Sequence, residues 1–258
     1  MELRVDGAAP ARPFELARSR FEIDHDLELP VAVEIRRDPT ERTRTVHEPT
    51  HHRLTVSEQV ARSSLAPELA VHEFAHMRRR EESHPSHMVD VSEAIYLASS
   101  GTDIDRTTVA HAYQIANHVR DIYADDITFE VASGEKLASF FESRLAEALA
   151  DQSAGSRYTG YRLSAGFDPA ITAVNAGFAL GLLERHDVER NHRLYELAHA
   201  AQADAPRVDV SRFRREFRDL NGVPNDTSCL RTLVDLFEAY FEARAKRTER
   251  ASRPRRGQ

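Results

Sequence analysis

The chain has 258 residues, of which 41% are hydrophobic and 30% charged, and its formal net charge is −7. This composition can form a sizeable core, and the acidic balance argues against nucleic-acid binding by the chain as a whole, because phosphate binding needs concentrated positive charge. The sequence has neither a signal peptide nor an apolar run of the roughly 18 to 20 residues that a bilayer requires, so we expect a cytoplasmic protein that does not bind membranes.

The N-terminal part of the chain predicts mixed structure. Apolar and β-branched residues alternate over 30–35, and a similar pattern covers 52–56. Both patterns indicate strands, whereas the polar segment 37–51 between them predicts a loop.

From Ser57 onward the periodicity becomes helical. Ser57 is a suitable N-cap for a helix over 58–64, and Pro67 opens a second helix that we expect to run to about Arg80. Pro85 then interrupts the helical pattern, because proline has no N–H group to donate to the preceding turn.

The remainder of the chain predicts helices almost throughout. We expect them over 90–99, 106–125 (capped by Asp105), 135–150, 169–185, 192–203, 209–220 and 227–246. The whole pattern predicts an α+β protein with a small N-terminal antiparallel or mixed sheet followed by a mostly α-helical body. We expect a catalytic domain over 1–150, a helical region over 151–247 and a flexible basic tail over 248–258, with one continuous domain as the alternative.

Two further features concern the C-terminal part. Cys229 has no second cysteine to pair with and lies in an apolar pattern, so we expect a buried structural thiol. The basic C-terminus predicts a solvated helix end, with binding of nucleic acid or another anionic partner as the alternative. Its basic residues are Arg244, Lys246, Arg247, Arg250, Arg253, Arg255 and Arg256.

The second predicted helix contains His72-Glu73-Phe74-Ala75-His76. Two histidines four residues apart lie one turn apart on the same helix face, so both imidazoles can bind one ion. Glu73 is rotated about 100° around the helix axis from His72, which sets its carboxylate beside the ion, where it can accept a proton from water. The motif therefore predicts a hydrolytic Zn²⁺ site with Glu73 as the general base.

A catalytic zinc site normally has three protein ligands, so a third donor is needed. The metzincin pattern requires glycine at position 79 and histidine at position 82, and it is excluded because Arg79 and Glu82 stand there. His84 and His87, which follow the site helix, are one option, and Glu93 is another.

The helix predicted over 106–125 offers further carboxylates on a polar stripe. Asn117, Asp121 and Asp125 recur every four residues, while Ile115 and Val119 belong to the packing side. The spacing alone leaves the choice between the two aspartates open.

The HEFAH motif followed by Asp121-Ile122-Tyr123-Ala124-Asp125 resembles the gluzincin-like metallopeptidases, which include membrane CAAX-prenyl and heat-shock peptidases and small soluble relatives. Their second helix reads Glu-x-x-Ala-Asp, so this chain differs in having aspartate at the first position. The sequence also resembles an uncharacterised haloarchaeal family with this pair of motifs.

The resemblance, which spans about residues 50–130, implies a zincin-like fold and assigns roles to the stripe. Asp121 becomes the third Zn²⁺ ligand, and Asp125 supports a ligand histidine by a hydrogen bond. We group Asn117 with Asp125 as a supporting residue. The resemblance also implies that strand 52–56 is an exposed edge that binds an extended substrate, with an ordinary packed strand as the alternative.

We therefore predict a zinc metallopeptidase that hydrolyses peptide bonds of a peptide or protein substrate. One alternative is a metal-binding regulatory or interaction protein that keeps the fold without general protease activity, and another is a binding module formed by the helical C-terminal half. The presence of Glu73 favours catalysis, because a structural zinc site has no use for a water-activating carboxylate.

Overall fold

The computed structural model describes residues 1–101, 103–132, 134–153, 168–188 and 192–251. The chain folds into two compact units. The first comprises residues 1–88 and 120–133, and the second comprises 89–119 and 134–258. The sequence predicted a boundary after residue 150. Residues 154–167, which follow it, lie outside the described residues, as do residues 252–258 of the predicted tail.

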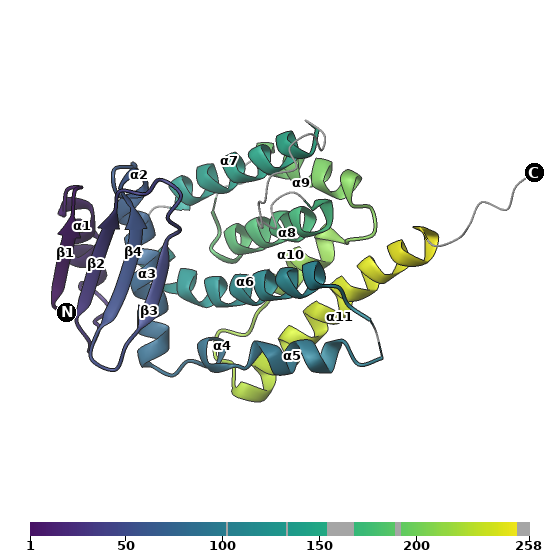
Figure 1. Ribbon diagram of the computed structural model, residues 1–258, viewed down its shortest axis with the longest axis horizontal. Coiled ribbons are helices and arrows are strands. Elements are labelled where there is room, and N and C mark those ends of the chain that lie inside the picture. Colours follow the sequence, from purple (N-terminus) through teal and green to yellow (C-terminus); the bar gives the residue numbers. More distant parts are fainter. Residues whose placement is uncertain (102, 133, 154–167, 189–191, 252–258) are drawn as a thin grey trace, which may run out of the picture. The chain divides into compact units, whose positions relative to one another are not determined.

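The first unit contains a mixed four-stranded sheet with the order β1-β2-β4-β3 (Figure 1). Its strands are β1 (Leu3–Gly7), β2 (Val31–Arg36), β3 (Arg44–His47) and β4 (His52–Ser57). β2 runs parallel to both β1 and β4, whereas β3 and β4 are antiparallel. This small sheet and the many helices of the chain make the protein α+β with a mostly helical body, as predicted.

The sheet corrects two predictions. The segment 37–51 is not entirely a loop, because residues 44–47 form β3. Three of the four β3 side chains are exposed, so the segment has no apolar alternation and its pairing with β4 defines the strand. The second correction is that β4 is not an edge strand, because β2 and β3 pair with its two sides. The edge nearest to it in the sheet is β3.

Helices α1 to α4 and the second half of α6 complete the first unit. They are α1 (Arg12–Phe21), α2 (Glu58–Ala61), α3 (Ala66–Glu81), α4 (Pro85–Met88) and α6 (Arg106–Val131). Ser57 caps α2 as predicted, with its hydroxyl accepting from Val60 N. α2 is shorter than the predicted helix over 58–64, because Arg62 already forms its C-cap.

The core of the first unit lies between the sheet, α1 and α3, and it also receives Ala124 and Ile127 from α6. β2 contributes Val31, Val33 and Ile35 from one face, as the alternating pattern predicted. On α3, Val71, Phe74, Ala75 and Met77 are fully buried. These buried side chains fix how α3 is rotated about its axis, and the rotation decides which way its polar side chains point.

The C-terminal end of α3 is anchored by the buried carboxylate of Glu81. Its two oxygens accept the backbone N–H groups of Glu28 and Leu29, each at 2.9 Å. His52 of β4, which is also buried, lies with Nε2 3.0 Å from Oε1 of Glu81. These bonds tie the helix to the loop before β2 and to β4, so the helix that carries the HEFAH motif is held at its C-terminal end.

The second unit consists of helices in its described residues. Besides the first half of α6, they are α5 (Val91–Ala98), α7 (Gly134–Ser153), α8 (Pro169–Arg185), α9 (His192–Asp204), α10 (Val210–Arg218) and α11 (Asp226–Ala251). All six positions, and α6 itself, agree with the helices predicted from the sequence to within three residues at either end, except that α6 and α11 run six and five residues past their predicted ends. Asp105 accepts from Thr108 N at 2.6 Å, which confirms it as the cap of α6.

α8 is the central helix of the second unit. It is buried on almost every side and packs against α7, α9 and α10. Gly177 and Gly181 face α10 so closely that a Cβ atom on Gly181 would stand 2.6 Å from the carbonyl oxygen of Arg214. The glycines therefore allow the two helix backbones to approach each other.

The C-terminal helix bears on two sequence predictions. Cys229 is buried, as predicted, and its burial raises the pKa of the thiol to about 11. Arg244, the first residue of the basic C-terminus, is not solvated as predicted, because it lies in a partly buried ion pair with Asp168 at 2.6 Å. The side chains of residues 246–258 lie outside the described part of the chain. No helix within the described residues is long and apolar enough to span a membrane.

Candidate metal centre

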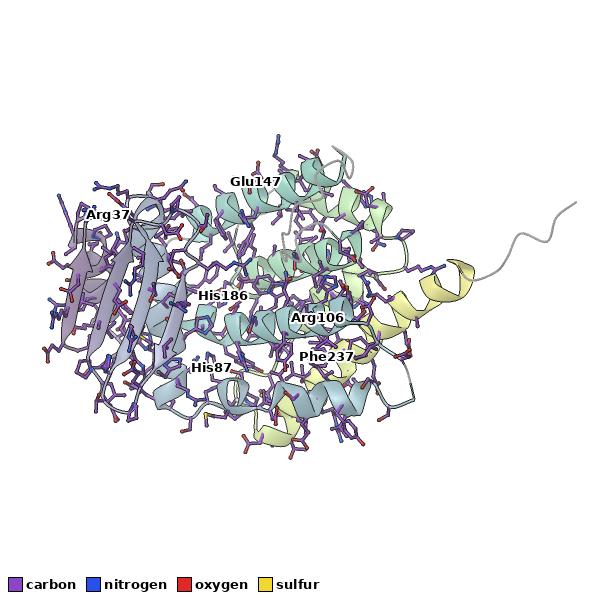
Figure 2. All side chains as sticks on the ribbon, viewed as in Figure 1. Arg37, His87, Arg106, Glu147, His186 and Phe237 are labelled. Carbon is purple, nitrogen blue, oxygen red and sulfur yellow. The ribbon has the colours of Figure 1, made fainter. Side chains whose placement is uncertain are left out.

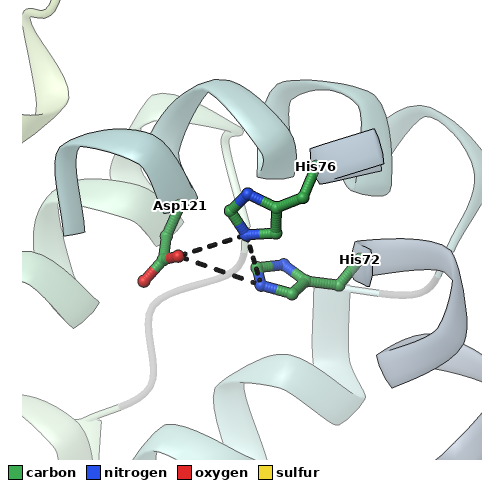
Figure 3. Close-up of side chains that lie close together, drawn as sticks. All are labelled: His72, His76 and Asp121. Carbon is green, nitrogen blue, oxygen red and sulfur yellow. Dashed lines mark hydrogen bonds and ion pairs between the residues drawn. The ribbon is translucent and has the colours of Figure 1, made fainter. Parts of the chain in front are cut away.

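The centre of the predicted site is formed by α3 and the second half of α6. His72 and His76 stand one turn apart on α3, and their Nε2 atoms are 3.0 Å from each other (Figure 3). The two rings meet at 84° with centroids 4.5 Å apart, so the nitrogens converge while the rings do not stack. Both side chains are only partly buried.

Asp121 of α6 completes a group of three. Its Oδ1 lies 3.3 Å from Nε2 of His76 and 3.9 Å from Nε2 of His72. The structure therefore brings together the three residues predicted as ligands, and Figure 3 shows their donor atoms converging on one point. No other such group of three is present among the described residues.

Asp125 lies one turn after Asp121 on α6 and contacts the other side of His72. Its Oδ1 is 2.7 Å from Nδ1 of His72, and the carboxylate is buried. A carboxylate can only accept here, so His72 carries its proton on Nδ1 and its Nε2 faces the group of three. This is the supporting contact that the resemblance implied for Asp125.

The charges around His72 are strongly negative. Burial lowers the pKa of this imidazole, but the charge and hydrogen bond of Asp125, followed by the charges of Asp121 and Glu73, outweigh burial and raise it to about 10. The same field that favours a proton on His72 also favours a metal cation, since both carry positive charge to the same place.

The second histidine of the motif is supported from α4. Nδ1 of His76 lies 2.8 Å from Nε2 of His87, which is labelled in Figure 2. Burial, together with the charges of His76, Arg120, His84 and Arg79, lowers the pKa of His87 to about 2, so this ring is neutral. The sequence offered His84 and His87 as ligands in their own right. The structure instead places His87 beside Nδ1 of His76, the ring nitrogen that does not face Asp121.

Glu73 is held by the edge strand of the sheet. Thr45 of β3 donates its hydroxyl proton to Oε2 of Glu73 at 2.6 Å. This contact could not be predicted from the sequence, because Thr45 belongs to the segment that was expected to be a loop. One oxygen of the carboxylate is thereby fixed, and the other can take a proton.

The remaining sequence candidates lie elsewhere. Asn117 is exposed on α6, one turn before Asp121, in the part of that helix assigned to the second unit. Its supporting role stays a prediction. Glu93, the reserve ligand, is exposed on α5 of the second unit.

A model of one protein family matches residues 1–242, and its description reads "Family of unknown function (DUF5781)". The chain belongs to DUF5781. Neither a curated protein nor a solved structure matches it. Membership in this family carries no activity with it.

The donors of this DUF5781 chain fit a zinc ion. Zinc prefers imidazole nitrogen and carboxylate oxygen, and in a tetrahedral site with bonds of about 2.0–2.1 Å the ligand atoms are roughly 3.3 Å apart. The separations here are 3.0, 3.3 and 3.9 Å. Three protein donors also leave a fourth position of a tetrahedron for another group.

Proposed function

We propose that the protein is a zinc-dependent metallopeptidase in which His72, His76 and Asp121 hold the ion and Glu73 is the general base. The single observation that carries the proposal is the convergence of the three donor atoms beside Glu73, within 3.9 Å of one another. When bound, zinc supplies Lewis acidity, which lowers the pKa of water and polarises a carbonyl group.

The role proposed for Glu73 follows from its position and its partner. It directly follows His72 on α3, so its carboxylate is offset around the helix axis from the ligand atoms and is not one of them. The hydrogen bond from Thr45 holds Oε2, and Oε1 can accept a proton from attacking water and then pass it to the leaving amine. A carboxylate at this place is what distinguishes a hydrolytic site from a purely structural one.

The substrate contact is proposed for β3, in place of β4. β3 is the outer strand of the sheet, and its other side is paired with β4. An extended peptide can add to such an edge through main-chain hydrogen bonds, which any sequence can make. Thr45 joins this edge directly to Glu73, so a peptide lying along β3 would run beside the general base. These features together support a zincin-like organisation of the first unit and a peptide or protein as substrate.

The test separates metal binding from turnover. We would measure the zinc content of the parent protein, Asp121→Ala and Glu73→Gln, and assay each on a quenched fluorescent peptide library. We expect Asp121→Ala to lower zinc occupancy, and Glu73→Gln to keep the ion and to lose turnover by at least about 100-fold, the usual scale of general-base catalysis. A parent that binds zinc and cleaves no peptide would refute the peptidase and favour the alternative of a metal-binding regulatory protein. Full zinc occupancy in Asp121→Ala would show that another residue is the third ligand.

A further inference from the structure

We propose that Ser86 and His84, acting through His87, form a directed chain of hydrogen bonds that fixes His76 in the tautomer with its Nε2 lone pair facing the metal site. His84, Ser86 and His87 would then be positioning residues, since none of them touches the ion. The inference rests on the proposed function only for the identity of that ion, because the tautomer itself is a property of the chain.

The chain of hydrogen bonds begins with a turn at the end of α3. Ser83 has a φ of 51°, in the left-handed region, and the bonds from Ser83 N to Arg80 O and from His84 N to Arg79 O close the helix. This is the Schellman arrangement, which reverses the chain direction. It brings α4 back alongside α3, so that the residues of His-Pro-Ser-His reach His76.

Three close contacts link the side chains. Nδ1 of His76 lies 2.8 Å from Nε2 of His87, and Nδ1 of His87 lies 2.9 Å from Oγ of Ser86. Oγ of Ser86 in turn lies 2.8 Å from Nδ1 of His84. Ser86 is almost fully buried, so its hydroxyl must find its partners within this group.

The direction of the chain is set at its far end. The backbone N–H of Ser86 points to Nδ1 of His84 at 3.3 Å, and a backbone N–H can only donate, so Nδ1 of His84 is an acceptor. The Ser86 hydroxyl proton can then go to that same nitrogen, which leaves Oγ to accept from Nδ1 of His87. A neutral His87 with its proton on Nδ1 has a lone pair on Nε2. That lone pair accepts from Nδ1 of His76.

The consequence is that His76 presents a lone pair on Nε2 towards Nε2 of His72. The two nitrogens are 3.0 Å apart. At this distance a proton or a metal cation has to lie between them, because two lone pairs would repel each other. The contact of Asp125 with His72 and the hydrogen bonds that lead to His76 therefore both favour a positive charge between the two Nε2 atoms.

The hydrogen bonds from His84 through Ser86 and His87 to His76 form a relay, which neighbouring side chains hold in place without taking part in it. Arg80 donates to the carbonyl oxygen of His87 at 3.0 Å, and Arg120 donates to that of Ser86 at 3.4 Å. The ring of His84 packs on Tyr123 of α6, with centroids 4.8 Å apart. The relay is thereby fixed to both helices that supply the predicted ligands, α3 and α6.

The first experiment reads the tautomers directly. Long-range ¹H–¹⁵N correlation spectra of the metal-free, full-length protein labelled at histidine would report which ring nitrogen carries each proton. We expect His76 and His87 both to be protonated on Nδ1, and Ser86→Ala to lower the fraction of His76 in this form. The Nε2–H form of His76 in the parent protein would overturn the proposal, and this measurement needs no variant to fold.

The second experiment measures the affinity for Zn²⁺ by competition with a chelator, and the absorption spectrum of the Co²⁺-loaded protein. His87→Leu removes the acceptor for His76. We expect this variant to weaken Zn²⁺ binding about 10- to 100-fold, the scale typical of such supporting contacts. We also expect it to shift the absorption spectrum of the Co²⁺-loaded protein. His87→Gln offers a carbonyl oxygen as the acceptor and should recover most of the loss. The control is His199→Leu, which changes an exposed histidine of α9 and should have no effect.

Peptide cleavage is not a readout in either experiment, so the proposed peptidase can fail while the relay stands. Equal Zn²⁺ affinity and an unchanged Co²⁺ spectrum in folded His87→Leu would overturn the relay while leaving the peptidase open. A parent protein that binds neither ion would overturn both proposals.

Discussion

Oδ1 of Asp125 lies 2.7 Å from Nδ1 of His72, and this contact decides which nitrogen of His72 is available to an ion. Asp125 is buried, whereas His72 is partly exposed. The consequences of this pair, and of the packing around it, can be measured.

Replacing Asp125 with asparagine should weaken zinc binding about 10- to 100-fold, because supporting carboxylates orient a ligand imidazole and raise its basicity. Chelator competition on purified protein gives the affinity. Glu130→Gln is the matched control, since it makes the same chemical change at an exposed position of α6, where Glu130 contacts His25. Equal affinities for parent and Asp125→Asn would contradict the role of Asp125.

Zinc uptake should release close to one proton from His72. The pKa of this imidazole is raised to about 10, so the ring is protonated at pH 7 to 8 and the ion must displace a proton. Titration calorimetry in buffers of different ionisation enthalpy counts the protons released, and the apparent affinity should rise with pH across this interval. In His72→Ala, the zinc that still binds should release fewer protons than in the parent. An unchanged number of released protons in this variant would be inconsistent with the raised pKa of His72.

The same shift predicts how the stability of the metal-free protein depends on pH. A folded-state pKa of about 10 lies above the usual histidine value of 6.5, so the stabilisation is complete below pH 6.5 and is lost as the pH rises towards 10. The free energy of unfolding from urea titrations should therefore fall over this range. In Asp125→Asn the fall should be smaller, because the main source of the shift is gone. If the free energy of unfolding depended on pH in the same way in both proteins, the raised pKa of His72 would be contradicted.

Replacing Thr45 with valine should lower kcat on cleaved peptides by roughly tenfold or more, the order expected when a hydrogen bond to a charged group is lost. Zinc content should stay unchanged, because Thr45 donates to Glu73, the proposed general base, rather than to a proposed ligand. Thr45→Ser keeps the hydroxyl and serves as the control. Loss of zinc from Thr45→Val would indicate instead that β3 supports the ligands.

In the second unit, Gly181→Ala should lower the free energy of unfolding by about 1–3 kcal/mol, the usual range for overpacking. The added Cβ would stand 2.6 Å from the backbone oxygen of Arg214, so α8 and α10 would have to move apart. Thermal and urea denaturation measure the change. Gly222→Ala is the control, because a Cβ there meets nothing within 4 Å, and Gly181→Ala with the stability of the parent would show that the helices separate at no cost.

The features that could be predicted from the residues alone are local. The spacing of His72 and His76, the four-residue step from Asp121 to Asp125 and the cap at Ser57 all depend on neighbours within about one helical turn, whose geometry is fixed by the backbone. The seven predicted helices from residue 90 onward were found for the same reason, because apolar periodicity records which face of each helix is buried.

The contacts between residues distant in sequence could be known only from the folded chain. Pairing with β4 created β3 from a polar segment and moved the open sheet edge away from 52–56. The packing of α3 against α6 places Asp121 beside the two histidines and Asp125 against His72. The turn at Ser83 brings His87 into contact with His76. These contacts depend on how elements pack in three dimensions, and no residue spacing along the chain specifies that arrangement.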